Sequence, residues 1–263
     1  MSLDLTGQGV VVTGAGRGIG AAFAKAFVSR GARVVVNDLD PETATATAAA
    51  LGAVAIPGDA SSESGVTALV EAARAELGQV DVFCANAGVA RGGTEAVDEK
   101  AWEVSWNVND MAHVRAARLL VPEWLERGGG TFVTTASAAG LLSIPGAAPY
   151  AVTKHAAVAF AEWLSMTYGA KGIRVHAVCP QGVRTDMLWS SGAAGRALME
   201  PQAVEPDQVA EDLLAAMADG RFLVLPHPEV AQMYANRAAD PDRWLAGMRT
   251  MAAALPPVTM GVD

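Results

Sequence analysis

Tyr150 and Lys154 are the side chains of this sequence whose types and spacing most directly suggest proton-transfer chemistry. They stand four positions apart in the stretch PYAVTKHA, residues 149–156. On a helix, positions i and i+4 project from the same face. A free tyrosine has a pKa of ~10, too high for a base near neutral pH, but an adjacent ammonium lowers that pKa by stabilising the phenolate. The pair therefore predicts a tyrosine that accepts and returns a proton, whereas His155, about 100° around the helix, is interpreted as structural.

The elements that must position this pair follow a regular alternation of short β-branched runs and longer alanine-rich segments. We expect strands at 9–14, 32–38, 53–59, 80–88, 131–137, 173–180 and 221–226. We expect helices at 17–31, 41–52, 62–78, 98–127, 149–169 and 206–220, and two more over 228–257, divided near Asp240–Pro241. Such alternation requires crossover connections and a parallel sheet with helices on both faces.

The fold prediction is therefore an α/β, doubly wound parallel sheet of about seven strands, Rossmann-like, with a helical C-terminal tail at about 228–255. No linker or repeat divides the chain, so we expect one domain over residues 1–263. The segment 181–205 carries glycine, serine and scattered apolar side chains, and we expect it to be irregular.

The glycine-rich stretch TGAGRGIG, residues 13–20, follows the first expected strand and opens the first expected helix. Glycines in this place let the backbone approach a pyrophosphate at a helix N-terminus. Ile19 stands where the common dinucleotide spacing has its third glycine, and no Gly-Lys-Ser/Thr follows as in a P-loop. Gly14, Gly18 and Gly20 instead fit Thr-Gly-x-x-x-Gly-x-Gly. A plain glycine-rich turn is the alternative, but the context favours nucleotide binding.

Asp38, at the end of the second expected strand, predicts which dinucleotide binds. An acid there accepts hydrogen bonds from the adenosine ribose and repels a 2′-phosphate, which favours NAD over NADP. Asp40 is a nearby competitor for this role. Arg17 argues the other way, because a cation in the loop could pair with a 2′-phosphate. We expect Asp38 to prevail, which makes NAD the cofactor and NADP less favoured.

Several motifs in chain order resemble those of the short-chain dehydrogenase/reductase family. They are TGAGRGIG, Asp59 after the third strand, ANAG (85–88) after the fourth, Asn109 in the long helix, Ser137 after the fifth, Tyr150 with Lys154, and PQGVRT (180–185) after the sixth. Each stands near the carboxyl end of a strand, the edge at which open α/β sheets bind ligands. The resemblance covers about residues 5–185.

The resemblance implies roles for these residues. Tyr150 is the acid/base, Lys154 also holds the nicotinamide ribose, Ser137 hydrogen-bonds the substrate oxygen, and Asn109 anchors a water on the proton path. Together with the loop, it implies a cofactor site of Gly14, Arg17, Gly18, Ile19, Gly20, Asp38, Asp59, Ala60, Asn86, Ala87, Gly88, Tyr150, Lys154, Pro180, Gly182, Val183 and Thr185. Asp59 would contact the adenine, and Thr185 the carboxamide.

Two departures from the family pattern affect the site. The family often has two asparagines where Ala85 and Asn86 stand, and Pro-Gly is common where this chain has Pro180–Gln181. We expect Gln181 to add a polar group at the substrate's edge. Leu142, Ile144, Met187 and Trp189 are expected to line the substrate pocket, with 186–205 as an apolar lid. The alternative is that these side chains only pack against the last helices.

The predicted function is hydride transfer between NAD(H) and an apolar secondary alcohol or ketone, with Tyr150 as general acid/base. One alternative is an NADPH-dependent 3-oxoacyl thioester reductase, which would want a basic residue where Asp38 stands. Another is a nucleotide-sensing protein without turnover, against which the intact catalytic set argues. A sugar-nucleotide epimerase would need a different glycine spacing and a larger C-terminal domain.

Composition excludes several other classes. The net charge of −9 and pI near 4.9 argue against a nucleic-acid partner and against a polybasic membrane surface. Cys84 and Cys179 read as buried thiols, and no metal-ligand spacing is present. Without a signal peptide or spanning segment in the sequence, we expect a cytoplasmic protein. By analogy with the family, we expect a homodimer or homotetramer formed through the long helices.

Overall fold

A seven-stranded, all-parallel sheet runs through the computed structural model, which describes residues 3–255. The strand order is β3-β2-β1-β4-β5-β6-β7. The strands are β1 (Gly9–Val12), β2 (Arg33–Val36), β3 (Val54–Ala55), β4 (Val82–Ala85), β5 (Gly130–Thr135), β6 (Ile173–Val178) and β7 (Leu223–Val224). The predicted doubly wound parallel fold is therefore confirmed. The outer ends of the domain predicted for 1–263, residues 1–2 and 256–263, lie outside the described residues.

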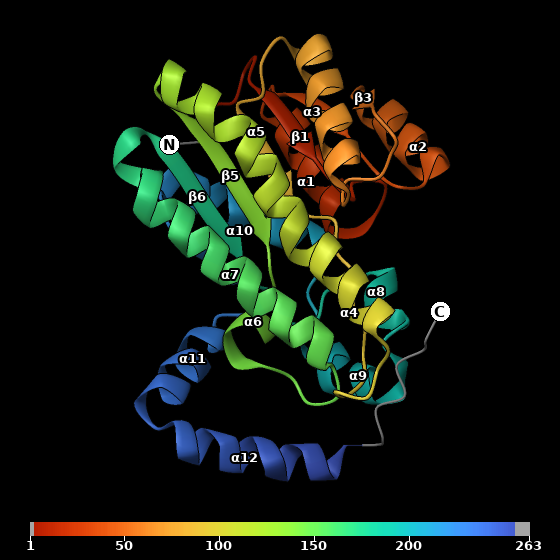
Figure 1. Ribbon diagram of the computed structural model, residues 1–263, viewed down its shortest axis with the longest axis vertical. Coiled ribbons are helices and arrows are strands. Elements are labelled where there is room, and N and C mark those ends of the chain that lie inside the picture. Colours follow the sequence, from red (N-terminus) through yellow and green to blue (C-terminus); the bar gives the residue numbers. More distant parts are fainter. Residues whose placement is uncertain (1–2, 256–263) are drawn as a thin grey trace.

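Helices cover both faces of this sheet (Figure 1). One face packs against α3 (Glu63–Leu77), α5 (Ala112–Arg127) and α7 (Ala148–Tyr168), and the other against α1 (Gly18–Ser29), α2 (Pro41–Leu51) and α10 (Pro206–Asp219). Successive strand residues point to opposite faces. Val11 therefore joins the first core and Val10 the second, which is why the strands read as uninterrupted apolar runs.

Local capping explains where the helices begin and end. The side chain of Asp40 accepts the N–H of Glu42 at the start of α2, and Gly52 ends that helix in the left-handed conformation at φ 66°. A side-chain oxygen at an N-cap satisfies one of the free N–H groups of the first turn, and glycine adopts positive φ without a Cβ penalty. Asp40 thus fixes the turn that follows β2 at the carboxyl edge of the sheet, and Gly52 fixes the turn that enters β3 at the opposite edge.

The structure corrects three details of the predicted elements. The helix expected over 98–127 is divided into α4 (Glu99–Trp106), a π-helical turn η1 (Asn107–Met111) and α5. The third strand pairs over only two residues, β3. The expected irregular segment 181–205 contains α8 (Asp186–Trp189), α9 (Gly192–Met199) and the 3-10 turn η3 (Glu200–Gln202). Helices of one or two turns leave too short a periodic pattern to be recognised.

The C-terminal tail is helical, as predicted, and divides at the expected place. It comprises α11 (Glu229–Ala239) and α12 (Pro241–Ala254), and Asp240 caps α12 by accepting the N–H of Arg243. In Figure 1, α11 lies beside the short helix α6 (Ala139–Leu142), below α7. Val230 of α11 is fully buried, whereas α12 has no buried residue. Helix α11 is therefore anchored in the core through a buried side chain, whereas α12 is not.

Candidate active site

The glycine loop takes a backbone path that only glycine permits at key positions. Gly14 and Gly18 have φ of +61° and +57°. A Cβ on Gly14 would lie 2.9 Å from the Cα of Ala87, and a Cβ on Gly20 would overlap the carbonyl oxygen of Gly14. Helix α1 begins at Gly18, which leaves its first N–H groups without helical partners. The loop can therefore hold a pyrophosphate as the sequence predicts.

Thr13 and Asn86 fix this loop to the end of β4. The hydroxyl of Thr13 accepts the N–H groups of Asn86 and Ala87, each at 3.0 Å, and donates to the carbonyl of Cys84 at 3.2 Å. The amide of Asn86 donates to the carbonyls of Thr13 and Gly14, at 2.9 and 3.2 Å. Asn86 thus holds the glycine loop, part of the predicted cofactor site, through hydrogen bonds that the sequence did not reveal.

Asp38 lies against the glycine loop. One carboxylate oxygen accepts the N–H of Gly16 at 2.9 Å and the other accepts the N–H of Asp40 at 3.1 Å. A Cβ on Gly16 would come within 2.9 Å of this carboxylate, so glycine is required for the approach. The competing acid, Asp40, is the N-cap of α2. The carboxylate beside the loop fits the hydroxyls of an adenosine ribose.

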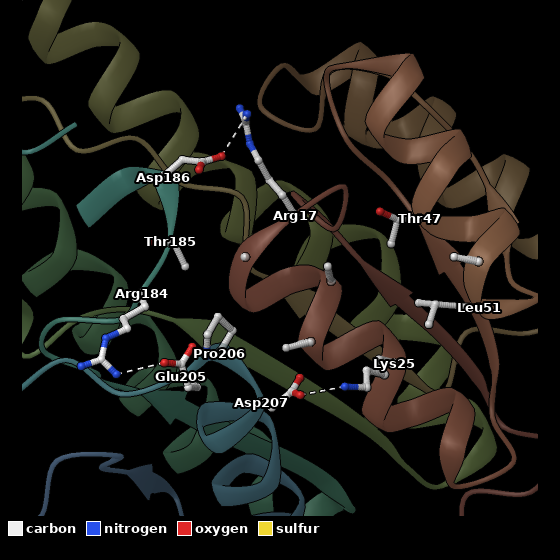
Figure 2. A pocket seen from close by; sticks show the side chains of 14 residues that line it. Arg17, Lys25, Thr47, Leu51, Arg184, Thr185, Asp186, Glu205, Pro206 and Asp207 are labelled. Atoms are coloured by element: carbon white, nitrogen blue, oxygen red, sulfur yellow. Dashed lines mark hydrogen bonds and ion pairs between the residues drawn. The ribbon is translucent and has the colours of Figure 1, made fainter. Parts of the chain in front are cut away.

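Arg17 pairs with Asp186 at the start of α8, with 3.4 Å between nitrogen and oxygen (Figure 2). The pair forms part of the rim of a groove of about 530 Å³ beside α1 and α2. Two further ion pairs, Lys25–Asp207 and Arg184–Glu205, lie along the same groove (Figure 2). Neither Tyr150 nor Lys154 lines it, so this groove is separate from the predicted reaction centre.

Asp59 follows β3 at the same edge of the sheet and is held by its neighbours. It accepts the N–H and hydroxyl of Ser61 at 2.8 and 2.6 Å and the N–H of Ser62 at 3.2 Å. Partial burial alone would raise the pKa of Asp59, but these hydrogen bonds outweigh burial and lower the pKa. The carboxylate is therefore a fixed acceptor, next to the half-buried Ala60.

Tyr150, Lys154 and Ser137 come together at the carboxyl ends of β5 and β6. Tyr150 and Lys154 lie in the first two turns of α7, and the ammonium of Lys154 is 5.8 Å from the centre of the Tyr150 ring. Lys154 is buried, and its Nζ donates to the carbonyl of Thr135 at 2.8 Å. Ser137 hydrogen-bonds the Tyr150 side chain. The predicted catalytic set is thus assembled.

The titration of this set differs from the expectation that Lys154 lowers the pKa of Tyr150. Burial raises the pKa of Tyr150, and the hydrogen bond with Ser137 only partly opposes this. Burial also lowers the pKa of Lys154 to about 8. The ammonium donates to the Thr135 carbonyl and does not offset the removal of the phenolate from water. The protein's own groups therefore keep Tyr150 protonated at neutral pH.

Asn109 lies in the π-helical turn and is fully buried. Its side-chain oxygen accepts the N–H of Val89 at 2.9 Å, and its amide nitrogen donates to the Val89 carbonyl at 2.9 Å and to the Thr153 hydroxyl at 3.0 Å. Thr153 precedes Lys154 on α7. A single π turn often re-aims side chains at functional sites. Asn109 thereby fastens the chain after β4 to the helix that carries Tyr150 and Lys154, and Thr153 is a partner that no sequence signal indicated.

Gly88 lies close to both Lys154 and Asn109. A Cβ there would be 3.3 Å from Nζ of Lys154 and 3.4 Å from the side-chain oxygen of Asn109. Any side chain at this position would press on both predicted catalytic residues, so glycine keeps the slot beside them open.

The loop after β6 closes the other side of the site. The carbonyl of Pro180 accepts the N–H of Ala138 at 2.8 Å. Val183 is buried, and a Cβ on Gly182 would overlap the Met199 carbonyl. A methyl group of Thr185 would lie 3.1 Å from a Cβ on Gly18, so Thr185 faces the glycine loop. The predicted cofactor contacts on the loop after β6 therefore lie opposite those on the glycine loop.

Gln181, predicted to lie at the substrate's edge, hydrogen-bonds two residues of the C-terminal tail. Its side-chain nitrogen donates to Glu229 of the tail at 3.1 Å, and its backbone N–H donates to Nδ1 of His227 at 3.1 Å. The side chain is thus bonded to the C-terminal tail. His227 and Glu229 were not predicted to belong near the site, because they lie 46 and 48 residues further along the chain.

The predicted substrate-pocket residues differ in exposure. Leu142 is buried and Ile144 half-buried. Met187 and Trp189 of α8 are 41% and 45% exposed, whereas Leu188 between them is buried at 3%. Leu188 therefore anchors α8 while its two apolar neighbours remain at the surface, an arrangement compatible with the predicted lid.

Two predicted absences can be examined within residues 3–255. No described helix is both long and apolar enough to cross a membrane, and no group of three or more His, Cys, Asp or Glu side chains in that range could hold a metal ion. Cys84 and Cys179 are both free and buried, as predicted.

Comparison with known proteins places this geometry in a family. Residues 8–195 match the family described as short chain dehydrogenase. "Short chain aldehyde dehydrogenase 1" of Euphorbia lathyris is 33% identical over 94% of this chain and 87% of the relative. "D-threitol dehydrogenase" of Mycolicibacterium smegmatis is 31% identical over 84% of this chain and 92% of the relative.

Among solved structures, a short chain dehydrogenase/reductase from Burkholderia phymatum in complex with NAD superposes with a TM-score of 0.85. It is 29% identical and covers 92% of this chain and 96% of its own. The fold and site thus define a Rossmann-type oxidoreductase. This chain belongs to the short-chain dehydrogenase/reductase family.

Proposed function

We propose that this enzyme transfers hydride between NAD(H) and a small, apolar secondary alcohol or ketone, with Tyr150 as the general acid/base. The observation that carries the proposal is the meeting of Tyr150, Ser137 and the buried Lys154 at the edge of the sheet where the glycine loop begins α1. The relatives described as dehydrogenases support the same reaction class.

The glycine loop and Asp38 fit the adenosine end of a nicotinamide dinucleotide, and Gly88, Val183 and Thr185 fit its other end. The bound nicotinamide would supply the hydride donor or acceptor. Asp38 supports NAD because its carboxylate would face a 2′-phosphate. The neighbouring structure solved with NAD agrees with this choice.

The protein's own groups would move the proton. In ketone reduction the Tyr150 hydroxyl gives its proton to the carbonyl oxygen, and in alcohol oxidation the phenolate left after loss of that proton takes the proton of the substrate hydroxyl. Ser137 donates a hydrogen bond to the same substrate oxygen and stabilises its developing charge. Because burial raises the pKa of Tyr150, the protonated phenol that ketone reduction needs is the resting form.

Tyr150→Phe tests the proposal because it removes the proton-transfer group and keeps the ring. We expect turnover of an alcohol and ketone panel, followed by NADH absorbance, to fall by about 10²–10⁴-fold, the range typical of general acid–base catalysis. NADH affinity, measured by fluorescence, should stay near that of the parent. Tyr168→Phe, at the far end of α7, is the matched control. Near-normal turnover by Tyr150→Phe would overturn the mechanism.

Two alternatives are decided by the same panel. An NADPH-dependent 3-oxoacyl thioester reductase would prefer acetoacetyl thioesters with NADPH over simple ketones with NADH. A nucleotide-sensing protein would bind NADH and turn over none of the substrates.

We also propose that the protein is cytoplasmic and forms a homodimer or homotetramer. The proposed association is supported by exposed apolar side chains on the outer face of α7, namely Val152, Trp163 and Met166.

A further inference from the structure

The two loops that carry the proposed reaction are both tied to the C-terminal tail. The first loop, 136–142, contains Ser137, and the second, 180–185, contains Val183 and Thr185. They bond directly to each other, since the N–H of Ala138 donates to the carbonyl of Pro180 at 2.8 Å. Each loop also bonds to the segment 227–237, which comprises the end of the loop after β7 and most of α11. We call this segment the tail brace.

His227 joins the brace to the second loop. The imidazole is buried, with 2% exposed. Its Nδ1 accepts the N–H of Gln181 at 3.1 Å, and its Nε2 lies 3.0 Å from the carbonyl oxygen of Gln202. A carbonyl can only accept and a backbone N–H can only donate. The ring is therefore the neutral tautomer with its proton on Nε2, and one side chain connects the second loop, the end of the lid segment and the tail.

Gln181 and Glu229 add a second link to the same loop. The side-chain amide of Gln181 donates to the Glu229 carboxylate at 3.1 Å. A glycine at position 181 would lack this contact. Gln181, one of the two departures from the family pattern, thus bonds to the tail twice, through its backbone and its side chain.

Arg237 joins the other end of the brace to the first loop and to α7. Its Nη1 donates to the carbonyl of Leu141 and lies 3.0 Å from Nε2 of His155. Because a guanidinium can only donate, Nε2 of His155 must accept, so the imidazole proton is on Nδ1, which bonds the Ala151 carbonyl at 2.8 Å. Leu141 lies four residues after Ser137, and His155 directly follows Lys154. His155, which we predict to be structural, thus connects the tail to the helix that carries Tyr150 and Lys154.

We infer that the tail brace positions the active site: Arg237 and His227 hold the Ser137 loop and the 180–185 loop at a fixed separation across the reaction centre. This inference rests on the proposed function. The bonds run to backbone atoms of both loops, so their loss would shift main chain as well as side chains. Displacements of about 1 Å in a catalytic arrangement can cost as much as ~10²-fold in rate. Arg237 and His227 are positioning residues, since neither contacts the reacting groups in the proposed mechanism.

Arg237→Met and His227→Phe test the brace by removing its polar bonds while keeping much of the side-chain volume. We expect amide hydrogen exchange to accelerate roughly tenfold in peptides covering 136–142 for Arg237→Met and 180–185 for His227→Phe. Exchange in β1 and α1 should be unchanged. On a ketone that the parent reduces, kcat should fall about tenfold for Arg237→Met, with NADH affinity within about twofold.

Conservative variants and a control separate positioning from general destabilisation. Arg237→Lys keeps one donor and His227→Asn keeps an acceptor for the Gln181 N–H, so each should restore part of the lost exchange protection. Arg243→Met, on the exposed helix α12, should match the parent. Unchanged exchange in both loops, or equal acceleration throughout the sheet, would overturn the inference. If no substrate is turned over, the proposed function fails, while the exchange measurements still decide the brace.

Discussion

At the scale of single residues, Asp38 is the side chain whose charge we propose as the selector of the cofactor. Its carboxylate is held beside the loop by the N–H groups of Gly16 and Asp40, so it cannot turn away from an incoming 2′-phosphate without breaking these bonds. Arg17, the cation that could have compensated, is paired with Asp186. Both members of that pair are largely exposed, and surface pairs are worth at most about 1 kcal/mol. We therefore propose that the fixed carboxylate of Asp38 outweighs Arg17 in the choice between NAD and NADP.

Asp38→Asn removes this charge and keeps an oxygen that can accept the Gly16 N–H. We expect NADPH affinity to rise by at least about tenfold, which is about 1.4 kcal/mol, while NADH affinity changes little. Fluorescence titration with both cofactors measures the ratio. Asp40→Asn is the matched control, because Asn is an equally good N-cap for α2. A ratio that shifts equally in both variants would remove Asp38 from the cofactor site.

His113 is a buried residue whose effect on stability depends on pH. It lies on α5 with 1% of its surface exposed, and neither ring nitrogen has a hydrogen-bond partner. Burial, together with the charge of Lys154, lowers its pKa from 6.5 to about 3. Between these two values the unfolded chain binds the proton and the folded chain does not. The free energy of unfolding therefore falls as the pH drops through this range.

His113→Leu should remove that acid sensitivity. The free energy of unfolding of the variant, relative to the parent, should rise by about 2 kcal/mol between pH 7.5 and pH 5, because only the parent then loses stability through this imidazole. Urea unfolding at the two pH values, at one protein concentration, measures the difference. If the difference in the free energy of unfolding between the two proteins were the same at both pH values, His113 would not be held neutral in the core.

At the scale of elements, the strand-to-helix turn at the glycine loop depends on how closely β4 and α1 approach it. A Cβ on Gly20 would overlap the Gly14 carbonyl and come within 2.6 Å of the Asn86 side-chain amide. The first of these atoms belongs to the backbone. The second is held in place because the Asn86 amide donates to the carbonyls of Thr13 and Gly14. The turn therefore has no room into which it could relax.

Gly20→Ala should consequently weaken NADH binding by at least about tenfold and lower the melting temperature. The expected loss of stability is about 1–3 kcal/mol, as for other overpacked sites. Gly247→Ala in α12 is the control, because its Cβ would meet nothing within 4 Å and alanine favours a helix. Calorimetry and NADH fluorescence on both variants make the comparison; normal NADH binding by Gly20→Ala would contradict the tight approach.

The elements also show what a sequence can and cannot predict here. Alternating strands and helices, and motifs at strand ends, were enough to predict the sheet and the meeting of Tyr150 with Lys154, because both depend on local periodicity. The π turn around Asn109 was missed, since an i→i+5 bond leaves no distinct apolar period. The contacts of Gln181 were missed because its partners, His227 and Glu229, are distant in sequence and follow no spacing rule. The raised pKa of Tyr150 depends on burial, which no motif encodes.

At the scale of the whole molecule, the outer face of α7 is the surface through which we expect chains to contact one another. Val152, Trp163 and Met166 are 44%, 49% and 77% exposed, and their separations of eleven and three residues place them on one side of the helix. Trp163 stacks on Phe160 and meets Tyr168 edge to face, so the aromatic surface is ordered. Exposed apolar side chains on one side of a helix favour an interaction site, and these lie on the long helix through which we expect the chains to associate.

Replacing both Trp163 and Met166 with Asp should therefore weaken self-association, because pairing the two faces would bury like charges. We expect sedimentation velocity to show a smaller species at concentrations where the parent is a dimer or tetramer, with circular dichroism unchanged. Leu245→Asp is the matched control, because Leu245 is 51% exposed on α12 and lies outside this face. An unchanged mass for the double variant, or an equal loss for the control, would place the subunit contact elsewhere. Since Tyr150 and Lys154 lie at the other end of α7, retained turnover by a smaller species would mean that each chain carries a complete site.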